Sequence, residues 1–176
     1  MDWLTGTGAV MVITVTSLIG NLLSKSYKER PKELKRWIFY LHHVVTQIRY
    51  MRLPFPVIFQ QLNAMTEASS YFSDFFNDLD VALNQRKEPI HSAWQHAITL
   101  VQRKWHLSRD DRELLLTLSD LLGKIGQDEQ LQHFQAAIET LTAHEVAALE
   151  DKKKYERIFS TLGLLVGVLL VVLLMG

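Results

Sequence analysis

The sequence predicts an all-α protein. A six-helix cytoplasmic bundle is expected between an N-terminal and a C-terminal transmembrane helix, with the last bundle helix continuous with the second span. Three observations favour this fold class. A stretch without charged residues lies near each end of the chain, glycine and proline are sparse between these stretches, and no segment alternates polar and apolar residues as a half-buried strand would.

Residues 1–25 are predicted to form the first transmembrane helix. No charged side chain occurs from Trp3 to Ser24, and the middle of this stretch is apolar and β-branched. About 20 apolar residues span the hydrocarbon core of a membrane. A cleaved signal peptide is the alternative, but it needs basic residues before the apolar run, where this chain has Asp2. An uncleaved anchor is therefore the favoured interpretation.

Residues 158–176 are predicted to form the second transmembrane helix, because they again carry no charge and follow a densely charged run. Six Lys/Arg lie between Lys25 and Arg36, four more lie between Lys152 and Arg157, and the outer flanks carry none. Lys and Arg near membrane ends stay cytoplasmic. We therefore expect a two-span protein of the cell membrane, with residues 26–157 in the cytoplasm and both termini on the other side.

Prolines and a glycine pair divide residues 26–157 into helix-sized pieces. The first predicted helix starts near Pro31, has an apolar stripe from Leu34 to Ile48, and runs to about Arg52. The second presents one apolar face, made of Ile58, Leu62 and Met65. The third follows a cap at Ser69 or Ser70 and carries Phe72, Phe75, Phe76, Leu79 and Leu83.

Pro89 opens the fourth predicted helix, whose apolar face consists of Trp94, Ala97, Ile98, Val101 and Trp105. Ser108 and Asp111 resemble a capping box at the start of the fifth helix, which should end at Gly123. The sixth piece has no Pro or Gly from Gln127 to Leu162. A single helix from about Asp128 to Met175, roughly 70 Å long, should therefore join the bundle to the second span.

The sequence argues against an enzyme. The absence of cysteine excludes thiolate catalysis and zinc–sulfur sites, and none of the seven histidines has a partner at metal-binding spacing. No nucleophile-elbow or phosphate-loop motif is present. Paired carboxylates at helix starts are better explained as caps than as acid–base catalysts. We predict no catalytic residue, no metal and no cofactor.

Charge and glycine spacing suggest interaction sites instead. Residues 53–151 hold seven Lys/Arg against fifteen Asp/Glu, a balance of −8, which disfavours nucleic acid. A cytoplasmic partner is expected at an acidic face containing Asp78, Asp80, Asp110 and Asp111, or else at two basic residues interpreted as lying near the membrane, Arg49 and Arg52. The Lys/Arg clusters beside the spans suit anionic membrane lipids.

Gly163 and Gly167 form a G-x-x-x-G pattern within the second predicted span. This spacing lets two helix backbones approach closely, either with another membrane protein or in a homo-oligomer. A lipid-facing glycine pair is the alternative, because glycine is common in membrane spans.

With these residues in order, the chain resembles the stage III sporulation protein AB family of endospore-forming bacteria. The landmarks cover nearly the whole length: Glu29-Arg30-Pro31, Tyr50 with Pro54, Ala93-Trp94, Leu122-Gly123 with Asp128, and Lys153/Lys154 before Leu162-Gly163 and Gly167. The chain departs from the family where a Leu-Glu-x-Glu-Ile pattern is replaced by residues that include Val45, Gln47 and Ile48, and where a Thr-Pro-Leu turn reads Leu53-Pro54-Phe55. These departures put any role of first-helix carboxylates in doubt.

The resemblance implies more than composition does. The family's cytoplasmic domain is similar to that of the inner-membrane platform proteins of type II secretion and type IV pilus machines. It implies a non-enzymatic platform in the channel complex between mother cell and forespore, in the mother-cell membrane, with other membrane proteins of that channel and a stage III sporulation protein AA-like ATPase as partners. A small membrane-anchored adaptor or signal transducer is the alternative, although tails this short beyond the spans leave little to bind an external ligand.

Overall fold

The computed structural model describes residues 26–68, 70–122 and 126–175, and these residues are helical or in loops, without any strand. The chain starts with a helix at residues 26–46, here called the N-terminal helix, which passes into the π-helix η1 (Gln47–Met51). It continues with α2 (Phe55–Met65), α3 (Tyr71–Asp80), the π-helix η2 (Val81–Gln85), α4 (Ile90–Val101), α5 (Arg109–Leu121) and α6 (Gln127–Met175). The all-α prediction and its six helical pieces are confirmed within this part of the chain.

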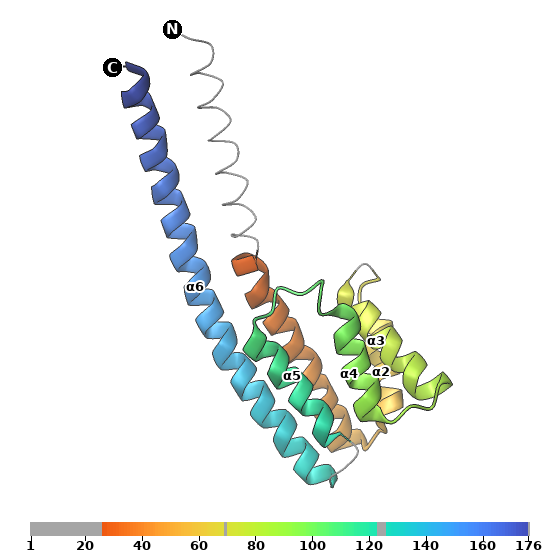
Figure 1. Cartoon of the computed structure of the whole chain (residues 1–176). Coiled ribbons are helices and arrows are strands. Elements are labelled where there is room, and N and C mark those ends of the chain that lie inside the picture. The colour runs from red at the N-terminus through yellow and green to blue at the C-terminus, as the bar shows by residue number, and fades with distance from the viewer. Residues whose placement is uncertain (1–25, 69, 123–125, 176) are drawn as a thin grey trace.

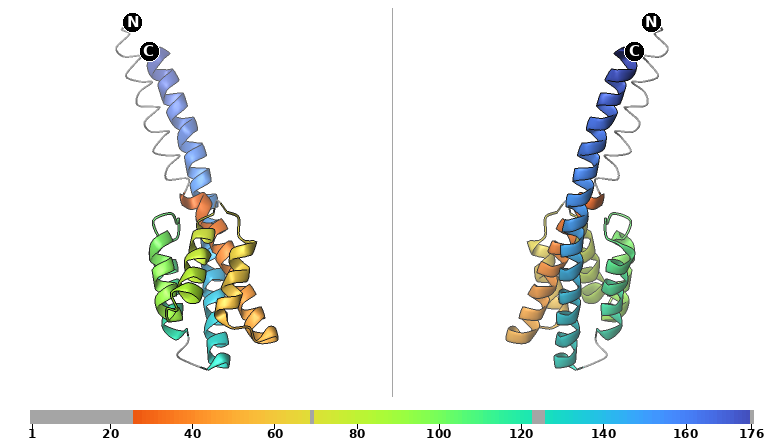
Figure 2. Two further views of the ribbon diagram at one scale, coloured as in Figure 1. Left: turned by 90° about the vertical axis from the view of Figure 1, so that its right-hand side faces the viewer. Right: turned by 90° about the vertical axis from the view of Figure 1, so that its left-hand side faces the viewer.

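The six pieces pack as a bundle in which the two longest helices are antiparallel. In Figure 1 the N-terminal helix and α5 lie between α6 on one side and α2, α3 and α4 on the other. Tyr27 and Tyr155 stack at 3.9 Å between ring centroids, and η1 contacts α6 near its start, so the pair runs together over the whole bundle. Figure 2 shows the same pairing from two further sides.

An aromatic cluster forms the centre of the core. Trp37 of the N-terminal helix is 1% exposed, and its ring contacts four aromatic rings from α3, α4 and the loop after α4: Phe72, Phe75, Trp94 and Trp105. Such pairs contribute about 0.5–1.5 kcal/mol each beyond the area they bury. The predicted stripe from Leu34 to Ile48 is buried except for the partly buried Ile38, and the predicted apolar face of the third helix, which extends into η2, is buried as well. The three- and four-residue spacing therefore identified most of the core.

Two details of the predicted faces differ from the structure. Met65, predicted to be on the core face of α2, is 58% exposed, because it is the last residue of the helix and lies beyond the packed turn of Leu62. Trp105 is buried as predicted, but it does not belong to α4, which ends at Val101. A turn and a loop lead from there to Ser108, and the loop returns Trp105 to the aromatic cluster.

The long sixth helix is confirmed. α6 runs unbroken from Gln127 to Met175, and its buried face follows the predicted residues Leu131, Phe134, Ile138, Leu141 and Ala148. Within the described residues, no helix is long and apolar enough to cross a membrane. The first predicted span, residues 1–25, lies outside the described residues. The two predicted spans and the domain boundaries at residues 25 and 157 stay predictions.

Candidate functional site

A partly buried network of hydrogen bonds and an ion pair, centred on Asp111, ties three helices together at the end of the bundle where the N-terminal helix starts. Arg30 donates from Nε to Oδ2 of Asp111 at 2.8 Å and from Nη2 to Oδ1 at 3.1 Å. His144 of α6 places Nδ1 2.7 Å from the same Oδ1. Asp111 has no exposed surface. The network therefore connects the N-terminal helix, α5 and α6 through one carboxylate.

Asp111 occupies this position because it is also part of the helix cap. Ser108 Oγ accepts from the Asp111 backbone N–H at 3.2 Å, and the Ser108 N–H donates to Asp111 Oδ2 at 2.8 Å. The capping box predicted at the start of α5 is confirmed, with Asp in the place of the usual Glu. Burial by itself would raise the pKa of Asp111, but the hydrogen bonds from Arg30 and Ser108 outweigh it and lower the pKa to about 2. The ionised carboxylate can only accept, so His144 carries its hydrogen on Nδ1.

We expect acid to weaken the domain through Asp111. A carboxyl whose folded pKa is lowered from 3.8 to about 2 stabilises the fold above pH 4, and this contribution is lost as the pH falls toward 2. The loss amounts to about 2 kcal/mol. Urea unfolding of residues 26–157 between pH 6 and pH 2 would measure it. Asp111→Asn should lack this part of the acid dependence, and an unchanged acid slope in the variant would contradict the prediction.

A second carboxylate–histidine pair lies beside the first. Glu33 accepts from the His106 backbone N–H at 2.8 Å, and His106 Nδ1 lies 2.7 Å from its other oxygen. Burial raises the pKa of Glu33, and the contacts with His106 partly offset that rise. A hollow of about 340 Å³ opens above this pair, lined by residues of the N-terminal helix, α3 and the loops before α3 and after α4. Its lining mixes acidic and basic side chains: Glu29, Lys32, Glu33, Arg36, Glu67, Ser70, Tyr71, Lys104 and His106.

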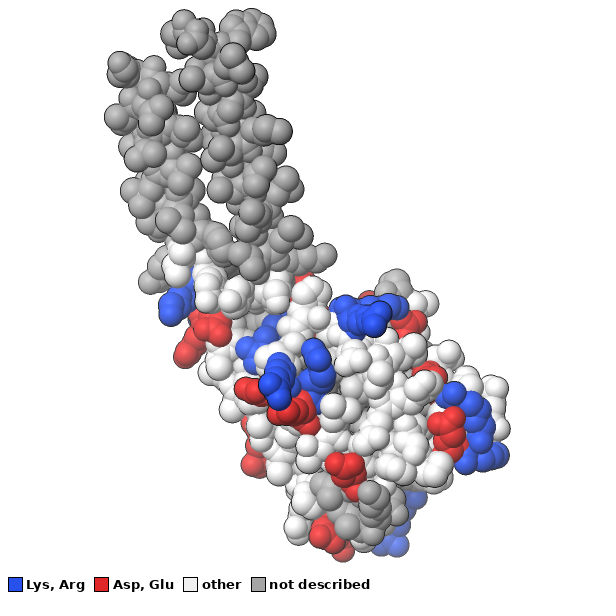
Figure 3. All heavy atoms as spheres, viewed as in Figure 1, with Lys and Arg blue, Asp and Glu red and all other residues white. Residues whose placement is uncertain are grey.

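The predicted acidic face is not one surface. Asp78 of α3 pairs with Arg86 at 3.1 Å and lies 3.2 Å from His96, and Asp80 accepts a hydrogen bond from Asn84. Asp110 and Asp111 start α5, and α4 packs between α3 and α5. The structure therefore corrects the prediction for Asp111, whose buried carboxylate is unavailable to a partner. Figure 3 shows acidic and basic residues interspersed on the face it draws.

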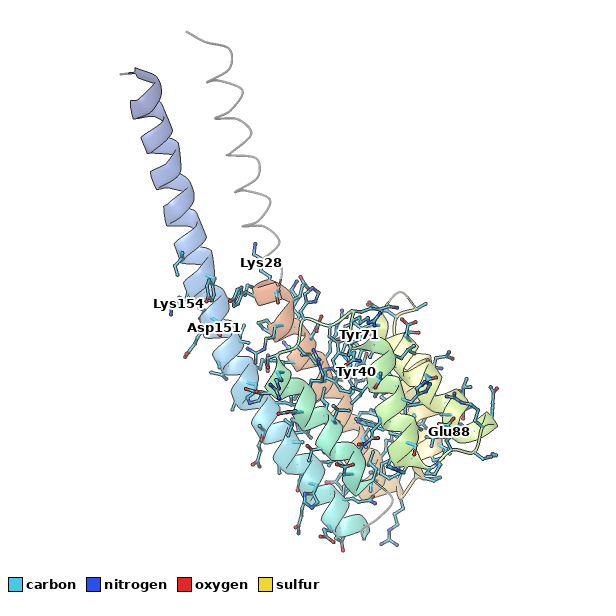
Figure 4. All side chains as sticks on the ribbon, in the orientation of Figure 1. Lys28, Tyr40, Tyr71, Glu88, Asp151 and Lys154 are labelled. Atoms are coloured by element: carbon cyan, nitrogen blue, oxygen red, sulfur yellow. The ribbon has the colours of Figure 1, made fainter. Side chains whose placement is uncertain are left out.

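The structure also moves the two predicted basic residues to the opposite end of the bundle. Arg49 and Arg52 line a hollow together with Asp128 and Leu131, at the start of α6. With the predicted spans they would lie at the end of the domain away from the membrane, and their role as a partner surface stays a prediction. The N-terminal helix begins at residue 26 at one end of the bundle. It leads into η1, which contains Arg49, at the other end. Figure 4 labels Lys28 and Lys154 at the other end, where the N-terminal helix and α6 meet.

Gly163 and Gly167 lie within α6, in a part of the helix whose side-chain surroundings the structure does not describe. Their role in helix packing stays a prediction. No group of three metal-ligating side chains comes together among the described residues.

Comparison with known proteins connects this geometry to a family. The family model for stage III sporulation protein AB matches residues 5–175. The chain belongs to this family. Stage III sporulation protein AB of Bacillus subtilis (strain 168) is 29% identical over 170 residues, covering 96% of this chain and 97% of that protein. The family resemblance inferred from the sequence landmarks is therefore confirmed.

A solved structure of the same family supports the fold. A chain described as stage III sporulation protein AB (SpoIIIAB) superposes with a TM-score of 0.65 at 21% identity, covering 72% of this chain and 98% of that one. Two of the sequence landmarks now have physical roles in this chain. Arg30 holds the buried Asp111, and Trp94 fills the aromatic core. Glu33 and His144 were not predicted as site residues. No local sequence pattern indicates that Glu33 contacts a residue 73 positions away or that His144 contacts one 33 positions away.

Proposed function

We propose that this chain is a non-enzymatic platform component of the membrane complex between mother cell and forespore. In this role it couples other membrane proteins of the complex to a cytoplasmic secretion-type ATPase during endospore formation. Membership of the stage III sporulation protein AB family supports the link to sporulation. The charge-free ends and the Lys/Arg beside them support two membrane anchors, with the helical domain in the mother-cell cytoplasm.

The continuity of α6 is the observation that carries the proposal. One helix begins at the end of the domain that holds Arg49 and Arg52, packs along the whole bundle, and continues to Met175. At 1.5 Å per residue it spans roughly 70 Å. A force or displacement applied at the far end of the domain would pass along this helix to the segment 158–175 without crossing a loop. A platform between a motor and a membrane needs such a rigid connection.

A two-glycine insertion after Ala148 should abolish function, while the same insertion after Lys87 should be tolerated. Two extra residues rotate the rest of α6 by about 200° relative to the bundle and separate Tyr155 from Tyr27. Lys87 lies in the loop between η2 and α4. The measurement is the count of heat-resistant spores after deletion of the gene in its native host and complementation with each variant at equal protein level. Equal spore counts from both insertions would contradict the rigid connection.

A further inference from the structure

The end of the bundle formed by η1 and the start of α6, here called the distal tip, exposes a side chain that helical periodicity would bury. Met51 lies three residues after the buried Ile48 and seven after the buried Val44, so an α-helix would keep it on the core face. The chain instead winds as a π-helix from Gln47 to Met51. Each residue of this wider helix advances less far around the axis, and the apolar stripe falls out of phase.

Met51 is therefore exposed, next in the chain to Tyr50, which an α-helix would expose as well. Tyr50 is 76% exposed and Met51 is 66% exposed, the two highest values among the large hydrophobic side chains that the structure describes. Wide turns of this kind occur frequently at functional sites. The segment ends at Arg52, whose φ of 50° is a left-handed conformation that non-glycine residues seldom adopt. The backbone here departs from the regular helix at some energetic cost and gains no core contact for Met51.

The charges at the distal tip are available to a partner. Arg49 and Arg52 form no ion pair with any residue that the structure describes, unlike Arg30 and Arg86. They border a hollow of about 360 Å³, which is also lined by Asp128, Leu131, Gln132 and Gln135. Arginine presents a planar fork of donors that suits a carboxylate in two-point contact. Tyr50 and Met51 lie between the two arginines in the chain and are exposed, so the distal tip offers a partner both charged and apolar contacts.

We propose that the distal tip is the docking surface for the cytoplasmic ATPase, which would present acidic side chains to Arg49 and Arg52 around an apolar depression that takes Tyr50 and Met51. This inference rests on the proposed function and names the surface that performs it. Position favours a protein over a lipid, since the distal tip lies at the opposite end of the bundle from Lys28 and Lys154. The acidic balance of residues 53–151 disfavours a nucleic acid.

The test is a binding titration between the full-length chain in detergent micelles and the purified ATPase, at low and high salt. Charge reversal by Arg49→Glu with Arg52→Glu should weaken binding at least about tenfold and flatten its salt dependence. Met51→Ser should weaken binding without changing the salt dependence. Matched controls at other exposed positions, Lys35→Glu with Arg103→Glu and Leu100→Ser, should bind like the wild type. Circular dichroism and melting temperature verify that every variant is folded.

The outcomes separate this inference from the function on which it rests. If the wild type binds and the distal-tip variants bind equally well, the docking surface is elsewhere and the platform function stands. If the wild type does not bind the ATPase at all, the proposed coupling fails, and this inference fails with it. If the distal-tip variants instead change the oligomeric state measured by light scattering, the surface pairs copies of this chain, which also overturns the proposal.

Discussion

Alanine in place of Asp111 should reduce the unfolding free energy of the domain by about 3–5 kcal/mol, as expected when one partner of a buried ion pair is removed. The fully buried carboxylate accepts hydrogen bonds from Arg30, from the Ser108 backbone and from His144. Its loss leaves Arg30 without its charge partner in a position where the side chain is only 21% exposed. Three helices lose their shared contact at once. Urea unfolding of residues 26–157 at pH 7 would measure the change.

The neighbouring carboxylate provides a matched control for this prediction. Asp110 has the same side chain in the same helical turn but is exposed. Asp110→Ala should change stability by no more than about 0.5 kcal/mol. Combining Arg30→Ala with Asp111→Ala should cost clearly less than the sum of the two single changes, because the second removes a group whose partner is already gone. A simply additive result would show that the two side chains do not stabilise one another.

Replacing Trp94 by alanine should cost about 3–5 kcal/mol. The indole is buried among Trp37, Phe59 and Phe75, and its Nε1 donates to the Leu115 carbonyl of α5 at 2.8 Å. Trp94→Phe keeps most of the packing but leaves that buried carbonyl without its donor, and it should cost about 1–3 kcal/mol. Thermal and urea unfolding would measure the loss of stability in each variant and so distinguish the two.

Leu100, on the exposed side of the same helix, is the control for Trp94. Its side chain is 52% exposed, so Leu100→Ala should change stability by no more than about 0.5 kcal/mol. If Trp94→Ala were as mild as Leu100→Ala, the aromatic cluster would not be the centre of the core.

The fold was largely predictable because it depends on local patterns. Spacing at three and four residues identified the buried faces, Ser108 with Asp111 identified the start of α5, and the lack of breakers after Gln127 identified the length of α6. Each signal involves residues within one or two helical turns. Capping and periodicity are properties of the single helix, so the sequence contains them without knowledge of the packing.

The candidate site was less predictable because it depends on contacts between distant residues and on a change in helix type. A count of acidic residues did not reveal that Asp78 is engaged by Arg86 or that Asp111 is buried by Arg30, 81 residues earlier. Nor does an α-helical period anticipate the wide turn of η1, which places Met51 in solvent. The direction of the first helix was needed to place Arg49 at the opposite end of the bundle from Lys28.

The antiparallel pairing of the first and last helices sets the order in which the protein can fold during translation. The aromatic cluster draws on residues up to Trp105, so it can form while the chain is still being made. The contacts of Asp111 with His144 and of Tyr27 with Tyr155 must wait for α6, which is made after the other helices of the bundle. Until then the N-terminal helix keeps one apolar side uncovered. A chaperone would meet this side of the nascent chain first, and truncation before His144 would leave it permanently exposed.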